Sequence, residues 1–238
     1  MDRLLRNPTL LLLVGLLLFR SLQNGSFSDP SAWILDTLVV LPGIIIGLSF
    51  HEFAHALTAT LCGDPTPKWQ GRVTVNPLAH FDPVGFLALL FIRFGWGKPV
   101  MIQPRNFRKP RRDELLVALS GVTMNFILAT LFMGLIRLLY EWSPAFLYGS
   151  MGPVVQDVLL QVVVINLVLM VFNLLPVPPL DGFNVLTQIF DLRRTAFYER
   201  VYDKGFVILM LLILFNVTGR ILQPTVFFLF DMLYGWFF

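Results

Sequence analysis

The sequence predicts an all-α membrane protein with about six transmembrane helices and a short re-entrant or β-hairpin segment between the second and third. Hydrophobic residues make up 56% of the 238-residue chain, and the mean hydropathy is +0.72. Charged residues account for only 14% of the chain, whereas a soluble domain has about 25%. Several apolar stretches approach the roughly 20 residues that a helix needs to cross a bilayer. We expect residues 1–238 to form a single membrane-embedded domain.

Six apolar segments are candidate spans, in chain order 8–22, 33–61, 114–140, 153–175, 203–217 and 219–237. The first follows Arg3 and Arg6 as a signal peptide would, but no small-residue cleavage site comes after it, and we expect a retained span. The run from Val84 to Phe94 is too short to cross as a helix, which predicts a re-entrant or interfacial segment. Lys68 to Val75 is rich in β-forming residues and predicts a short strand or hairpin.

Basic residues gather on one side of this topology. Fifteen Lys and Arg residues precede the first span or lie in the loops after the second and fourth spans, while the opposite loops contain only Arg20 and Arg220. Because cytoplasmic loops carry an excess of basic residues, we expect a multi-pass protein of the plasma or inner membrane with both termini and the basic loops in the cytoplasm. The run from Arg105 to Arg112 then sets topology, and nucleic-acid binding is not indicated. The one cysteine, Cys62, excludes an internal disulfide and a cysteine-based metal site.

The second apolar segment contains His51-Glu52-Phe53-Ala54-His55, an HExxH pattern. A helix places residues four apart on one face, so both imidazoles can bind one zinc ion with Glu52 beside them as a general base. HExxH is common by chance, but here it directly follows the apolar run from Val39 to Phe50. Ionisable residues inside a membrane helix are unfavourable unless they have a function. The pattern therefore predicts a hydrolytic zinc site within the bilayer.

Zinc bound by two histidines needs a third protein ligand and one open position for water. The candidates are His80, Asp82, Glu114 and Asp181. Asp181 lies in a proline-rich break after the fourth span, which the predicted topology brings to the depth of the HExxH motif. We favour Asp181 as the ligand, and the alternative role for this residue is a helix N-cap. We interpret His80 as a turn histidine, because Asn-Pro and Asp-Pro pairs flank it.

The HExxH motif together with Asn173 and Leu180-Asp181-Gly182 resembles the site-2 protease family of intramembrane zinc metalloproteases. The resemblance makes residues 40–190 the catalytic core and the segments 8–22, 203–217 and 219–237 accessory. The stretch from Asn76 to Gly85 resembles the prokaryotic branch that has neither PDZ nor CBS domains. One departure is Val122, which stands where the family often has proline in a Gly-Pro-x-x-Asn motif.

The resemblance implies a set of site residues and one zinc ion per chain: His51, His55 and Asp181 as zinc ligands, Glu52 as the base, and Asn173 as the residue that contacts the substrate near the metal. The expected reaction is hydrolysis of peptide bonds within or near transmembrane segments of membrane-protein substrates. An edge strand from Arg72 to Val75 could receive the unwound peptide.

Two other functions use the same residues. A transporter would need further acidic or histidine residues along the spans, and a non-proteolytic zinc-binding scaffold would not need Glu52. The expected partners are transmembrane-helix substrates and the lipid bilayer, with a homodimer or an adaptor protein as further possibilities.

Overall fold

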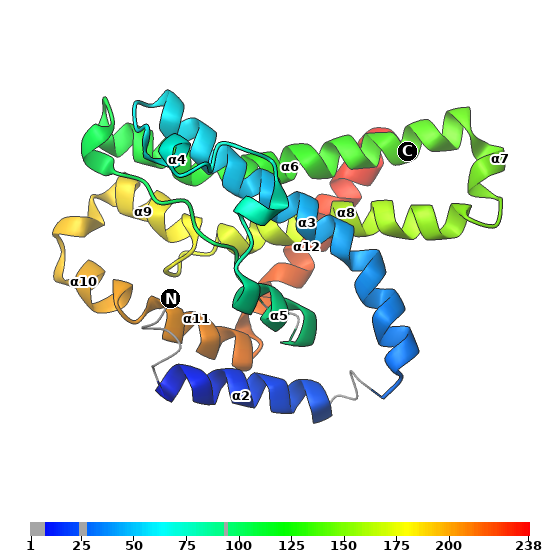
Figure 1. Cartoon of the computed structure of the whole chain (residues 1–238), viewed down its shortest axis with the longest axis horizontal. Helices are drawn as coiled ribbons and strands as arrows, with labels where there is room; N and C mark the ends of the chain where they lie inside the picture. Colours follow the sequence, from blue (N-terminus) through cyan, green and yellow to red (C-terminus); the bar gives the residue numbers. More distant parts are fainter. Residues whose placement is uncertain (1–7, 24–27, 93–94) are drawn as a thin grey trace.

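The computed structural model describes residues 8–23, 28–92 and 95–238, which form eleven α-helices, three 3-10 helices and no β-strand (Figure 1). The all-α fold class is confirmed for these residues; Arg3, Arg6 and Phe94 lie outside them. The α-helices are α2 (Pro8–Gln23), α3 (Pro30–Leu61), α4 (Thr66–Trp69), α5 (Pro83–Ile92), α6 (Pro110–Trp142), α7 (Pro144–Leu147), α8 (Gly152–Asn173), α9 (Asp181–Phe190), α10 (Ala196–Tyr202), α11 (Gly205–Leu214) and α12 (Val217–Phe237). The 3-10 helices are η1 (Pro77–Ala79), η2 (Pro104–Asn106) and η3 (Leu192–Arg194).

Helices α3, α6 and α8 form the core of the bundle. α6 and α8 lie side by side with α7 at the turn between them, and α3 packs against both (Figure 1). α3 comes very close to α8 at Gly43, where an added Cβ would lie 3.0 Å from the carbonyl oxygen of Gln161. Small residues at such crossings let membrane helices approach backbone to backbone. The helix that carries the HExxH motif is therefore held directly against the rest of the core.

Judged by length and composition, fewer helices can span a membrane than the sequence predicts. α3, α6 and α8 are each long and apolar enough to cross a membrane, and α11 with α12 passes the same test only as a pair bent by 75°. The described residues thus contain three candidate spans, or four with the bent pair, where the sequence predicts about six. Asn216 has a left-handed φ of 55° at the bend between the last two predicted spans. A multi-pass helical membrane protein is confirmed.

The predicted strand or hairpin between Lys68 and Val75 is wrong. The segment contains the end of α4 and irregular turns, and the only β-type pairing in the described residues is an isolated bridge between Phe81 and Gly97. Side chains bond the backbone here: the Arg72 guanidinium donates to the carbonyls of Ala79 and Lys98. These bonds hold the loop without a strand ladder, so no edge strand exists at residues 72–75 to receive a substrate.

The chain doubles back tightly between α8 and α9. Residues 174–180 contain three prolines, which cannot continue a helix, and α9 begins at Asp181. A Cβ at Gly182 would lie 2.1 Å from the carbonyl oxygen of Leu174. Glycine is required for this close approach, and the turn brings Asp181 beside the end of α8.

We predict that Gly43→Leu lowers the free energy of unfolding by about 1–3 kcal/mol, the usual effect of overpacking a tight contact. The new side chain would meet the backbone of α8, which cannot rotate away. Gly15→Leu on α2 is the matched control, because a Cβ there meets nothing within 4 Å. Thermal unfolding in a mild detergent measures both variants, and equal melting temperatures for the two would contradict the predicted close packing.

Candidate metal centre

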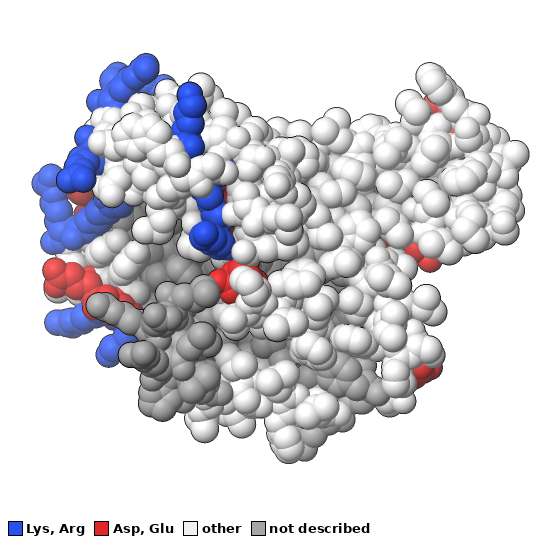
Figure 2. Space-filling model, in the orientation of Figure 1, with Lys and Arg blue, Asp and Glu red and all other residues white. Residues whose placement is uncertain are grey.

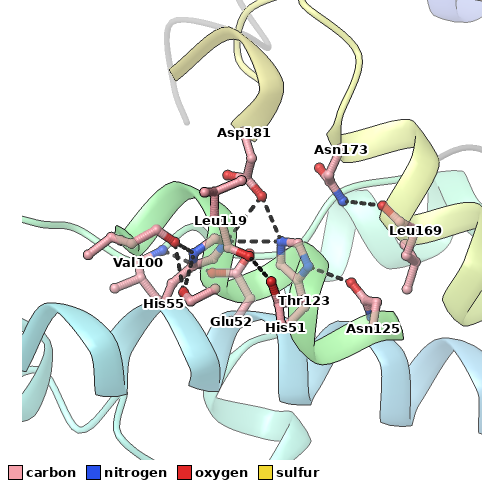
Figure 3. Close-up of polar contacts among 12 residues, drawn as sticks. His51, Glu52, His55, Val100, Leu119, Thr123, Asn125, Leu169, Asn173 and Asp181 are labelled. Carbon is pink, nitrogen blue, oxygen red and sulfur yellow. Dashed lines mark hydrogen bonds and ion pairs between the residues drawn. The ribbon is translucent and has the colours of Figure 1, made fainter. Parts of the chain in front are cut away.

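Three potential ligand atoms converge between α3 and α9 (Figure 3). His51 and His55 are buried, with exposures of 5% and 8%, and their Nε2 atoms are 3.0 Å apart. Each Nε2 lies 3.2 Å from Oδ2 of Asp181. The spacing of four residues along α3 places both rings on one face, as the motif predicts. No other group of three such residues is found in the part of the chain that the structure describes.

Helix α6 packs against both imidazoles. A Cβ at Gly121 would lie 2.6 Å from Cε1 of His51 and 2.6 Å from Nε2 of His55. The His51 Nδ1 lies 2.6 Å from Oδ1 of Asn125, and the His55 Nδ1 lies 2.7 Å from the carbonyl oxygen of Val117. Glycine at 121 is thus what allows α6 to come close enough to bond the two rings.

These bonds determine which ring nitrogens carry protons. The Asn125 amide is oriented by its own donors, because Nδ2 bonds the carbonyl of Gly47 at 3.1 Å and Oδ1 of Asn166 at 2.9 Å. Oδ1 of Asn125 and the Val117 carbonyl can only accept, so each Nδ1 donates and each neutral ring presents an Nε2 lone pair. In their neutral form, the two rings direct these lone pairs toward Oδ2 of Asp181.

This donor set fits a metal ion. Oδ2 of Asp181 is buried and receives no hydrogen bond within the described residues, which is unfavourable for a carboxylate oxygen. A cation among the three atoms would satisfy the carboxylate and both lone pairs at once. Two neutral imidazoles and one carboxylate are a ligand set typical of catalytic zinc, which keeps the fourth position open for water.

Glu52 lies beside the two imidazoles on the same helix (Figure 3). Its side chain is half-buried, and Oε2 accepts a hydrogen bond of 3.1 Å from the backbone N–H of Val100. Val100 belongs to a segment with neither helix nor strand, residues 98–103, which we call the strap. The strap is held at Lys98, whose N–H bonds the carbonyl of His80 at 2.8 Å and whose carbonyl accepts from Arg72.

Asp64 holds the other end of the strap, a role that the sequence did not predict. It is fully buried, and its carboxylate accepts from the Gln103 N–H at 2.6 Å and from Asn106 Nδ2 at 2.8 Å. Burial opposes ionisation of Asp64, but hydrogen bonds from Asn106, Thr66 and Gln103 outweigh it and lower the pKa below its ordinary value. An Asp-Pro pair such as Asp64-Pro65 indicates a turn, but no pattern in the sequence indicates the contacts of Asp64 with Gln103 and Asn106.

The rival ligands all have other partners. His80 is fully buried and donates from Nε2 to the carbonyl of Thr74 at 2.7 Å, and burial lowers its pKa. Asp82 accepts from the N–H groups of Val84 and Gly85 at the start of α5. Glu114 pairs with Arg193 and Gln188. Asp181 is the first residue of α9, where Leu180 is the N-cap and no side chain bonds the helix end, so the cap interpretation of Asp181 is wrong.

Two asparagines, Asn173 and Asn125, lie near the ligand cluster (Figure 3). Asn173 is half-buried at the end of α8, and its Nδ2 donates to the carbonyl of Leu169 at 3.0 Å (Figure 3). Its role in substrate contact stays a prediction. Asn125, fully buried against His51, was noted only as part of a helix motif. The signal that could have found it is an amide inside an apolar span, which needs a partner there.

We predict that Asn125→Leu weakens metal binding at His51 about 10- to 100-fold, the usual effect of removing an outer-shell partner. The His51 ring would lose the bond that directs its Nε2 lone pair toward Asp181. Titration of the metal-free protein with zinc in competition with a chelator measures the affinity. Thr123→Val is the control. Thr123 is exposed on the same helix, and its hydroxyl donates to the carbonyl of Leu119 rather than to either imidazole. Wild-type affinity in Asn125→Leu would contradict the orienting role.

Comparison with known proteins adds independent evidence. A model of "Peptidase family M50" matches residues 149–216. The candidate zinc metalloprotease YwhC of Bacillus subtilis is 34% identical over 181 residues, covering 76% of this chain and 82% of YwhC. The candidate zinc metalloprotease Rip2 of Mycobacterium tuberculosis strain H37Rv is 32% identical over 220 residues, covering 90% of this chain and 75% of Rip2. Rip2 of Mycolicibacterium smegmatis is 28% identical over 206 residues, covering 85% of this chain and 76% of that protein.

No solved structure matches the chain significantly. The described residues form no β-strand and therefore contain neither a PDZ nor a CBS domain, which agrees with the branch that the sequence resembles. Identity above 30% across three quarters of the chain, together with a buried His-His-Asp cluster, identifies the family. The chain belongs to peptidase family M50, the site-2 protease family of zinc metalloproteases.

Proposed function

We propose that this metalloprotease cleaves its substrates inside the membrane, at peptide bonds within or near their transmembrane segments. The observation that carries the proposal is where the ligand atoms lie. His51 and His55 belong to α3, which is long and apolar enough to cross a membrane, and Asp181 meets them from the start of α9. A hydrolytic centre built on such a helix is reached most directly by a substrate that is itself in the bilayer. Within this proposal, residues 40–190 form the catalytic core.

The proposed ligands are His51 Nε2, His55 Nε2 and Asp181 Oδ2, holding one zinc ion per chain. Zinc bound there would polarise a scissile carbonyl and lower the pKa of a water molecule. Glu52 would take the proton from the attacking water and pass it to the leaving amine. The Val100 N–H holds Oε2 of Glu52, so Oε1 is the oxygen proposed to exchange the proton. Asn173 would bond the developing oxyanion after releasing the Leu169 carbonyl.

An apolar cavity of about 400 Å³ reaches to within one helical turn of the HExxH motif, although neither the three proposed ligands nor Glu52 lines it. It is lined by residues of α3, α5, α8, α11 and α12, including Leu48, one helical turn before His51, and Phe172, the neighbour of Asn173. A cavity with this lining suits the apolar side chains of a transmembrane segment. A cavity there supports a substrate that enters from the bilayer, and that substrate must unwind before it reaches Glu52, since a closed helix offers no peptide bond for attack.

The charge distribution supports an orientation in the membrane. Lys and Arg side chains gather at one end of the molecule, around α4 and the start of α6, and are sparse on the visible surface of the other end (Figure 2). By the positive-inside rule, we place this basic end and the basic loops in the cytoplasm. The C-terminal Phe238 packs on Tyr140, near the opposite end of α6, so this orientation does not support the cytoplasmic C-terminus that the sequence predicts. His55 lies six residues before the end of α3 at Leu61, roughly 10 Å at 1.5 Å per residue. The centre is therefore proposed in the cytoplasmic half of the bilayer.

The ligand assignment predicts about one zinc ion per purified chain. Asp181→Ala should lose zinc or hold it much more weakly, because one of three protein ligands is gone. His80→Ala should keep zinc, because His80 bonds Thr74 in a loop outside the cluster. Metal analysis by mass spectrometry provides the measurement. Zinc retained in Asp181→Ala and lost in His80→Ala would move the third ligand to His80.

Glu52→Gln should retain zinc and the fold but lose hydrolysis by on the order of 10²-fold or more, the range of general acid–base catalysis. The amide keeps the size of the carboxylate and cannot accept the proton from water. Comparative membrane proteomics of cells with wild-type or Glu52→Gln protein measures the effect, and membrane peptides that accumulate only with the variant are its substrates. Near wild-type cleavage of such a substrate by the variant would remove Glu52 from the mechanism.

The orientation predicts a cut in the cytoplasmic half of a substrate helix, with a soluble fragment released into the cytoplasm. Helix-weakening residues such as Gly, Asn or Pro near the scissile bond should speed cleavage, because unwinding a helix in lipid exposes unpaired backbone groups. Replacing them with Leu should slow it. Mass spectrometry of the products locates the bond, and labelling of a cysteine at position 105 tests the topology. Cuts in the outer half, or external labelling, would invert the orientation.

A further inference from the structure

Helix α6 contacts both parts of the candidate centre. Through the carbonyl of Val117 and the side chain of Asn125 it bonds the two imidazoles of α3. Near its start it bonds α9, the helix that begins with Asp181. The distance between His51, His55 and Asp181 therefore depends on how α9 is attached to α6.

The attachment is a set of polar bonds at the end of α9. Arg111 on α6 donates to the last carbonyls of α9, from Nε to Gln188 at 2.5 Å and from NH2 to Ile189 at 2.6 Å. Gln188 Nε2 donates to Oε2 of Glu114 at 2.7 Å. Arg193, just beyond α9, binds both carboxylate oxygens of Glu114, with NH1 at 3.0 Å from Oε1 and NH2 on Oε2. Glu114 thus joins α6 to the end of α9 and to the turn that follows.

Glu114 is only 6% exposed, while the side chain of Arg193 is 44% exposed. A buried carboxylate that loses its cation is left with an uncompensated charge. Glu114 is therefore stable only where it keeps its contact with Arg193. The bidentate contact adds a fixed orientation, since the planar guanidinium must lie in line with the carboxylate. The chain leaves α9 through Asp191, two residues before Arg193. Asp191 has a left-handed φ of 52°, a conformation that aspartate tolerates.

We propose that Glu114 and Arg193 are a positioning pair for the metal centre. They fix α9 on α6 so that Asp181 Oδ2 stays within reach of both imidazoles before zinc binds. Neither residue belongs to the cluster of ligand atoms, and they act on the metal only through Asp181. The inference rests on the proposed function, because it requires Asp181 to be a zinc ligand.

The test is the zinc affinity of the full-length, metal-free protein, measured by competition with a chelator. Glu114→Gln and Arg193→Gln should each raise the zinc dissociation constant about 10- to 100-fold, the range for partners that orient a ligand. The double variant should be less impaired than the product of the two single effects, since residues that act as a pair are not additive.

Two matched controls separate positioning from a general loss of charge. Arg194→Gln removes the neighbouring arginine, which is 86% exposed and pairs with Asp191 instead. Glu141→Gln breaks the surface ion pair with Arg137 at the other end of α6. Both controls should bind zinc as the wild type does. An equal loss of affinity in either control and in Glu114→Gln would overturn the inference.

A second measurement reads the position of α9 directly. Hydrogen exchange in the metal-free protein should be faster in α9 of Glu114→Gln and Arg193→Gln, and unchanged in α3 and α8. If Glu114→Gln does not fold, Arg193→Gln and Arg193→Lys carry the test, since Arg193 is partly exposed. Lysine keeps the charge without the bidentate contact and should give an intermediate zinc affinity.

The outcomes also distinguish this inference from the proposed function. Wild-type zinc affinity in Asp181→Ala would remove the ligand assignment itself. Loss of zinc in Asp181→Ala with wild-type affinity in Glu114→Gln and Arg193→Gln would leave the ligand assignment standing and overturn only the positioning pair.

Discussion

The arrangement of this protein depends on holding three electron-pair donors together inside an apolar bundle. Without a cation, the Nε2 atoms of His51 and His55 and the Asp181 carboxylate gain nothing from facing one another at 3.0–3.2 Å. Contacts with other residues must therefore hold these three groups in place. The rings are held by Asn125 and Val117 on α6, and Asp181 is held by the tight turn before α9 and by the attachment of α9 to α6. A site preorganised in this way needs little rearrangement to bind a metal ion.

Close backbone approach is the second requirement. Gly43 lets α3 meet α8, Gly121 lets α6 meet the imidazoles, and Gly182 lets the chain reverse against the end of α8. In a membrane, helix association draws on van der Waals contact and interhelical hydrogen bonds, because lipid tails are as apolar as the side chains that they replace. The Asn125–Asn166 bond between α6 and α8 is one such link, and it shares Asn125 with the metal centre.

The loop between α3 and α6 follows a different principle. It contains buried polar side chains that bond the backbone, with Asp64 holding Gln103 and Arg72 holding Ala79 and Lys98. Such bonds satisfy backbone groups that would be unpaired without regular structure. They also hold the strap at both ends around Val100, whose N–H meets Glu52. An irregular loop thereby places a backbone donor beside the proposed base.

The sequence by itself determined the helical membrane class, the HExxH face of α3 and the preference for Asp181 over His80. These conclusions follow from local rules: hydropathy over a window, the helical repeat of four residues, and prolines that end a helix. Only the tertiary structure decided the partners of those residues. Asn125 is 74 residues from His51, and Arg193 is 79 residues from Glu114, so no local pattern relates them. The predicted strand at residues 72–75 failed because side chain–backbone bonds, which no propensity describes, replaced a strand ladder with turns.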